Sequence, residues 1–253
     1  GFKPKSVMTR VGQLTFDVPQ VRGGGFYPSA LEKGTRTEQA LNIALAEMYV
    51  QGVSTRKVTD ILLINPNTTK SITDLVLKTA KGFASKGTRL RALTGSFGPR
   101  YIASRAAYAI ASHAALDAYA NDRGPKDAVV LACFGDPGLA ALKEVSPVPV
   151  VGMADASILQ ACAIGNRFSI VTGGERWQSM LEEFVANHGL SSRLASVRTV
   201  APTGADIARN PKAAMELLAK GCRACVEEDG ADVVILGGAG LAGLAAKLKP
   251  MVD

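Results

Sequence analysis

One thiol of this sequence stands where a protein can use it for chemistry. Cys133 ends an apolar run in the stretch VVLACFGDPGL and is followed closely by glycine, aspartate and proline. Asp136 is a good helix N-cap and Pro137 a good first helical residue, so we predict that a helix begins there. A helix N-terminus lowers the pKa of a nearby thiol, and the thiolate is the reactive form. The pattern therefore favours a thiol acid or base over the alternative, a small buried hydrophobic side chain.

A second group of polar side chains follows an earlier apolar run. The stretch INPNTT offers Asn65, Asn67, Thr68 and Thr69 directly before the helical pattern of residues 71–84. One of these side chains must cap that helix. The others are predicted to hydrogen-bond a carbonyl or carboxylate, helped by the free N–H groups of the helix.

Two more turns repeat this arrangement in the second half of the chain. In VTGGER, Thr172 and Glu175 have the spacing of a capping box, which leaves Gly173 free to let a ligand approach the backbone. In VILGGAGLAGL, Gly238 and Ala239 offer only N–H donors and space. This last stretch is nearly a copy of the one around the first thiol, with a glycine in place of the cysteine.

The other three cysteines carry weaker signals. Cys222 and Cys225 form a CxxC within a helical pattern, with no second CxxC and no histidine nearby, so we predict neither a metal site nor a redox pair. Cys162 follows a helical stretch and is predicted to belong to the core.

The elements that must position these turns form one repeating pattern from residue 61 onward. Short apolar runs alternate with Ala-rich helical segments, which is typical of an α/β fold with parallel sheets. Because VVLACFGDPGL and VILGGAGLAGL resemble each other, we predict two similar Rossmann-like lobes, at about 60–153 and 154–253. Their strand ends would meet at one cleft, where a ligand binds. The runs predicted as strands are 61–65, 89–93, 128–133, 147–153, 168–173, 196–202 and 232–238.

The composition bounds the class of protein. The chain has 253 residues, of which 47% are hydrophobic, and a formal net charge of +7. That length allows a sizeable core, and the basic balance raises the expectation of a polyanion partner only modestly. No apolar run approaches the roughly 20 residues of a membrane span, and the N-terminal stretch does not read as a signal peptide. We therefore expect a soluble cytoplasmic protein without a membrane partner, whose thiols are reduced.

Residues 1–59 differ in character from the rest. They are basic and turn-rich, and residues 37–58 read as an amphipathic helix. The stretch TRVGQLTFDVPQVRGGGFYPSALEKGTRTEQALNIALAEMYVQGVSTRKV resembles the N-terminal region of mutator-type bacterial transposases. The acidic catalytic domain of that family has no counterpart here, so the resemblance implies no transposition activity. Two alternatives stay open: a fused fragment without a function of its own, and an arm whose lysines and arginines bind nucleic acid.

The remaining motifs carry a second resemblance. INPNTT, GPRYIASRAA, CFGDPGL, PVVGMADA, IVTGG and LGGAGLAG, in this order, resemble the aspartate/glutamate/hydantoin racemase superfamily over about residues 61–245, and its hydantoin and allantoin racemases most. The resemblance implies a small-molecule substrate, no metal and no organic cofactor, and leaves a homo-oligomer open. It also implies two cysteines on opposite faces of a planar enolate-like intermediate, of which Cys133 matches the first. The substrate-binding residues that we predict are Asn65, Asn67, Thr68, Phe134, Gly135, Thr172, Gly173, Gly238 and Ala239.

The family pattern is broken at the second cysteine, because Gly238 occupies that position. A single thiol exchanges a proton on one face, whereas racemisation needs delivery to both faces. The leading hypothesis is therefore a racemase-superfamily enzyme that acts on a hydantoin-like ureide or amino-acid derivative, with Cys133 as its only thiol acid/base. The alternatives are a one-base decarboxylase or isomerase and a silent ligand-binding protein.

Relatives are expected to continue beyond residue 250 with another strand and helix, so the second lobe is expected to lack its last elements.

Overall fold

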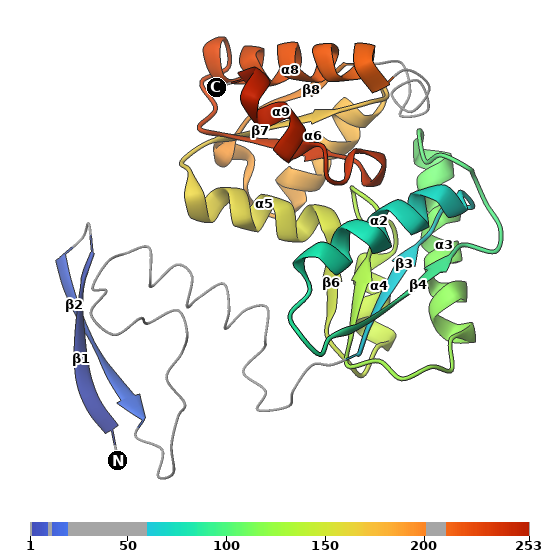
Figure 1. Ribbon diagram of the computed structural model, residues 1–253, viewed down its shortest axis with the longest axis horizontal. Coiled ribbons are helices and arrows are strands. Elements are labelled where there is room, and N and C mark those ends of the chain that lie inside the picture. Colours follow the sequence, from blue (N-terminus) through green and yellow to red (C-terminus); the bar gives the residue numbers. More distant parts are fainter. Residues whose placement is uncertain (1, 10–11, 20–59, 201–210, 253) are drawn as a thin grey trace. The chain divides into compact units, whose positions relative to one another are not determined.

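The chain divides into two compact units, residues 1–57 and residues 58–253, in the computed structural model (Figure 1). The residues that the structure describes are 2–9, 12–19, 60–200 and 211–252. The helix predicted at residues 37–58 therefore lies outside the described residues.

The first unit contains an antiparallel hairpin. Strands β1 (Phe2–Thr9) and β2 (Gly12–Pro19) pair along their whole lengths. No strand is predicted for this stretch from the sequence. Leu14, Phe16 and Val18 nevertheless alternate with polar residues, which is the period of a strand and the signal that could have revealed β2.

The second unit is an α/β structure with two parallel sheets, as predicted. The first sheet has the strand order β4-β3-β5-β6, and the second has the order β8-β7-β9. Every run predicted as a strand overlaps one of these seven strands. Their bounds are β3 (Asp60–Asn65), β4 (Arg89–Thr94), β5 (Ala128–Leu131), β6 (Val150–Gly152), β7 (Phe168–Thr172), β8 (Leu194–Thr199) and β9 (Val233–Gly237).

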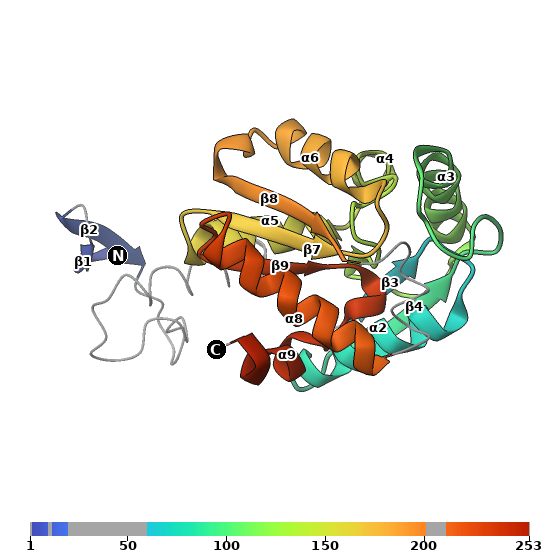
Figure 2. The same ribbon diagram turned by 90° about the horizontal axis from the view of Figure 1, so that it is seen from above.

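Helices cover both faces of the two sheets. In the second sheet, α8 packs on one face, while α5 and α6 pack on the other (Figure 2). Helix α5 also connects the last strand of the first sheet to the first strand of the second. The bounds of the helices are α2 (Lys70–Phe83), α3 (Arg105–Asn121), α4 (Leu139–Val145), α5 (Met153–Ile164), α6 (Trp177–Asn187), α8 (Pro211–Glu227) and α9 (Ala245–Val252), with short 3-10 turns at η1 (Ser191–Arg193) and η2 (Ala239–Leu241).

The core follows from the period of the central strands, because successive side chains point to opposite faces of a sheet. In β3, Leu62 and Ile64 pack with residues of α3 and α4, whereas Leu63 packs with Val76 of α2. Both faces of β3 are buried, which explains its unbroken apolar sequence. The sheet thereby holds the turns that follow β3 and β5 side by side, since β3 and β5 are hydrogen-bonded neighbours.

Removal of residues 1–59 is expected to leave residues 60–253 folded. All strands of the two parallel sheets, and the buried clusters around them, come from residues after 59. We expect the truncated chain to keep the circular dichroism of an α/β protein. Its Tm should stay within about 4 °C of the Tm of the full chain, the shift that roughly 1 kcal/mol produces in a domain of this size. An insoluble or unfolded truncation would show that the first unit is required for folding.

Candidate active site

Cys133 lies in a sharply bent turn between β5 and α4. Three residues of this turn have positive φ angles, Gly135 at 94°, Asp136 at 53° and Gly138 at 84°. Asp136 is the one non-glycine residue with a positive φ in the part of the chain that the structure describes. Glycine adopts positive φ at little cost, but in a non-glycine residue such as Asp136 this conformation costs about 1–3 kcal/mol, and residues strained in this way tend to cluster at functional sites. The strain thus marks this turn as a candidate site.

The helix predicted to start at Asp136 begins instead at Leu139, so that prediction is wrong. The Asp136 carboxylate accepts hydrogen bonds from the backbone N–H groups of Ala154 and Asp155, at 3.0 and 2.7 Å. It therefore caps α5, a helix later in the chain. Its left-handed backbone allows the side chain to reach another helix, and no local sequence pattern could indicate which one.

The thiol of Cys133 is buried, with 6% of the residue exposed. Its Sγ donates a weak hydrogen bond to the Phe134 carbonyl oxygen, at 3.8 Å. Burial raises the pKa of the Cys133 thiol, and the Asp136 carboxylate raises that pKa further. The predicted lowering of this pKa is therefore wrong, because the helix expected beside the thiol starts six residues later, at Leu139. The resting form of the group is the protonated thiol.

Two aromatic residues that were not predicted from the sequence pack against the turn that contains Cys133. The Tyr108 hydroxyl of α3 donates to the Gly135 carbonyl oxygen at 2.9 Å. The Trp177 indole of α6 covers Gly135 so closely that a Cβ added there would lie 2.6 Å from the ring. Its Nε1 donates to the Ile102 carbonyl oxygen at 2.9 Å. The one sequence signal for a special role of Trp177 is that it is the single tryptophan of the chain. Its contact with Gly135 could not be predicted, because the two residues are far apart in sequence.

The polar turn after β3 uses most of its side chains internally. The Asn65 amide donates to Asn67 Oδ1 at 3.0 Å and to Thr73 Oγ1 at 2.9 Å. Asn67 Oδ1 also accepts from the Thr69 N–H at 2.8 Å, and both asparagines are buried. Thr68 is half-buried. The two asparagines thus shape the turn, and substrate binding by Asn65, Asn67 and Thr68 stays a prediction.

The turn after β7 is built differently from the predicted capping box. Helix α6 begins at Trp177, and its N-cap residue Arg176 makes no side-chain capping bond. The first turn is closed by the backbone, since the Trp177 N–H donates to the Gly174 carbonyl oxygen at 3.0 Å. The predicted capping by Thr172 and Glu175 is therefore wrong. Thr172 and Gly173 are buried at the end of β7, and their contact with a substrate stays a prediction.

The turns after β5 and β9 are brought together. A Cβ added at Gly237 would lie 2.8 Å from the Phe134 ring, so this ring packs against the end of β9. Ala239 belongs to the same buried cluster as Ala132, the neighbour of Cys133. The structure thus unites Cys133 and Phe134 of the first lobe with the Gly238 turn of the second. A protonated thiol has the chemistry of a proton donor.

Comparison with known proteins decides the relationship. A family model described as Asp/Glu/hydantoin racemase matches residues 61–253. The chain belongs to this family. A hydantoin racemase from Pseudomonas sp. is 36% identical over 199 residues, which are 76% of this chain and 80% of that protein. The crystal structure of an allantoin racemase from Pseudomonas fluorescens superposes with a TM-score of 0.75 and 33% identity, over 77% of this chain and 83% of that one.

The beginning of the chain has a different relationship. Residues 1–80 match the mutator family of transposases. A transposase of an insertion sequence element from Burkholderia multivorans is 64% identical over 83 residues, which are 32% of this chain but only 21% of that protein. The predicted resemblance of the N-terminal stretch to these transposases is therefore confirmed.

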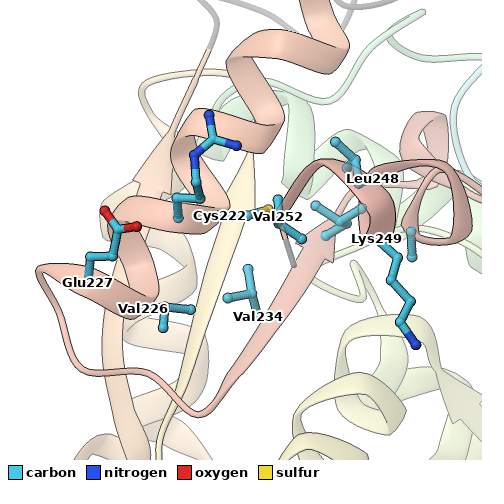
Figure 3. A pocket seen from close by; sticks show the side chains of 10 residues that line it. Cys222, Val226, Glu227, Val234, Leu248, Lys249 and Val252 are labelled. Carbon is cyan, nitrogen blue, oxygen red and sulfur yellow. The ribbon is translucent and has the colours of Figure 1, made fainter.

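A groove of about 330 Å³ lies away from Cys133 in the racemase-family unit (Figure 3). It runs between α8, β9 and α9, and its walls are apolar apart from Arg223, Glu227 and Lys249. Cys222 lines it, and Cys225 lies buried on the same helix. Among the described residues, no group of three or more histidine, cysteine or acidic side chains could hold a metal ion, and no helix is long and apolar enough to cross a membrane.

Proposed function

We propose that this chain transfers a proton at the carbon alpha to a carbonyl, in a hydantoin-like ureide or an amino-acid derivative, with Cys133 as its only thiol acid/base. The observation that carries the proposal is the strained turn that buries Cys133 at the junction of the two lobes. The substrate class is supported by the similarity to a hydantoin racemase and an allantoin racemase.

The proposed chemistry uses one face of the substrate. The resting thiol of Cys133 first loses its proton to water, and the thiolate so formed removes the α-proton. The electron pair of the broken C–H bond is delocalised into the carbonyl as an enolate. The resulting thiol returns a proton, which has exchanged with solvent, to the same face. Gly238 carries no side chain that could serve the opposite face. Exchange of the α-proton therefore proceeds faster than inversion of the carbon.

The raised thiol pKa supports a second candidate, a one-base decarboxylase. In that reaction the bond between the α-carbon and a carboxylate breaks, CO₂ leaves, and the electron pair stays on carbon as an enolate. The Cys133 thiol then donates its proton to that carbon, and the thiolate regains a proton from water. This route needs only the protonated thiol, which is the resting form.

The proposal is tested by incubating the chain in D₂O with a panel of enantiopure hydantoins, allantoin, amino acids and substituted malonates. Proton NMR measures deuterium at the α-carbon and loss of carboxylate, and polarimetry measures inversion. We expect deuterium uptake without matching loss of optical rotation on at least one ureide or amino-acid derivative. CO₂ release from a malonate alone would favour the decarboxylase. Binding without either reaction would leave a silent ligand-binding protein.

A further inference from the structure

The Asp136 carboxylate occupies an unusual place for an ionisable group. The residue is 2% exposed, lies three positions after Cys133 in chain order, and has a left-handed backbone. Its N–H donates to the Cys133 carbonyl oxygen at 3.1 Å, so the thiol residue and the carboxylate are joined in one tight turn. A Cβ added at Gly152 would lie 2.1 Å from Asp136 Oδ2, which shows that the glycine leaves room for this oxygen.

The same carboxylate connects the turn to the helix that links the two lobes. Its two oxygens accept the N–H groups of Ala154 and Asp155, in the first turn of α5. The positive end of a helix dipole favours an anion at this position. A displacement of α5 would therefore be transmitted to the turn that carries Cys133.

We propose that Asp136 is a positioning residue for Cys133: its carboxylate ties the turn of the thiol to the inter-lobe helix α5 and places a negative charge in the same turn as the sulfur. The inference rests on the proposed function only in taking Cys133 as the reacting group. Asp136 would also act on the protonation of Cys133, because a nearby carboxylate favours the protonated form of a thiol. Asp136 thereby keeps Cys133 ready as a proton donor.

The groups around Asp136 agree with this role. Burial raises the pKa of Asp136 to about 7, against the opposing effect of the α5 N–H groups, so the carboxylate is charged in the range where a thiol titrates. The Tyr108 hydroxyl of α3 lies 3.4 Å from the Asp136 carbonyl oxygen. Asp155 of α5 forms an ion pair with Lys143 at 3.0 Å, and its other carboxylate oxygen lies 3.2 Å from His188 Nε2. The negative charge of Asp155 also raises the pKa of Asp136.

The test measures the alkylation rate of Cys133 by iodoacetamide from pH 6 to 11, with mass spectrometry of the peptide to separate it from the other three cysteines. Asp136→Asn keeps a residue that caps helices and tolerates a left-handed backbone, but it removes the charge. Below the midpoint of its profile, the alkylation rate of Cys133 follows the thiolate fraction, so we expect the rate at each pH to rise about tenfold in this variant, the effect of a fall of about one unit in the pKa. Asp122→Asn is the control, because that carboxylate pairs with Arg91 and Lys126 instead.

An unchanged alkylation rate in folded Asp136→Asn, or an equal rise in Asp122→Asn, would overturn the proposal. A general loosening of the turn would also expose the thiol and lower its pKa, because burial raises that pKa. Tyr108→Phe controls for this effect, since it removes the hydrogen bond to the Gly135 carbonyl oxygen and leaves the Asp136 charge in place. An equal rise in Tyr108→Phe would also overturn the proposal. If Asp136→Asn does not fold, Asp136→Ser decides by the same criterion. Alkylation needs no turnover, so this inference and the proposed function can fail independently of each other.

Discussion

Replacement of Cys133 by alanine is expected to lower the rate of α-proton exchange on a responding substrate by about 10²- to 10⁴-fold, the range that a positioned acid or base supplies. The reason is that Cys133 is the thiol at the junction of the two lobes, where the Phe134 ring meets the end of β9. Alanine is only slightly smaller than cysteine, so the buried cluster around this position should remain packed. The exchange rate is measured by proton NMR in D₂O.

The matched control for this variant is Cys162→Ala. Cys162 is a half-buried thiol of α5 that packs against the same cluster as Cys133. Its removal should leave the exchange rate within about twofold, since general acid–base catalysis requires a group within hydrogen-bond reach of the reacting proton. Exchange that persists unchanged in a folded Cys133→Ala variant would contradict the role of the thiol and support a different base.

The parallel architecture could be predicted from sequence because its signals are local. The central strands β3 and β7 are buried on two faces, so they appear as apolar runs between Ala-rich helical segments. The near-copy of VVLACFGDPGL in VILGGAGLAGL also predicted that these two turns meet, and Ala132 and Ala239 do share a buried cluster. Chain order and strand period were sufficient for this part.

The details of the turns could not be predicted in the same way, because long-range contacts override local preferences there. Asp136 and Pro137 have the residue types of a helix start, yet the carboxylate caps α5. Thr172 and Glu175 have the spacing of a capping box, yet α6 begins only at Trp177. The ring of Trp177 packs against Gly135, in the turn after β5. The expected lowering of the Cys133 pKa failed for the same reason, since burial of the thiol and the Asp136 carboxylate raise that pKa instead.

Introducing a thiol at Gly238 is expected to convert one-sided exchange into racemisation. The Gly238 turn follows β9 and lies against the turn of Cys133, so a sulfur there would approach the opposite face of the substrate. Space is available, because a Cβ at this position would make only an ordinary contact with Leu241 Cγ at 3.5 Å. A second acid or base should raise the rate of inversion by about 10²- to 10⁴-fold.

The backbone sets the cost of this substitution. Gly238 has a φ of +155°, a region that side-chain-bearing residues rarely adopt, so about 1–3 kcal/mol of stability should be lost. Gly238→Ala is the matched control, since it carries the same backbone cost without the thiol. Polarimetry on an enantiopure 5-substituted hydantoin should show inversion by Gly238→Cys, but neither by Gly238→Ala nor by the double variant Cys133→Ala, Gly238→Cys.

A native chain that already inverts the hydantoin as fast as it exchanges the α-proton would show that another group serves the second face. A folded Gly238→Cys variant that exchanges the proton but never inverts the carbon would place the turn of β9 away from the reacting face.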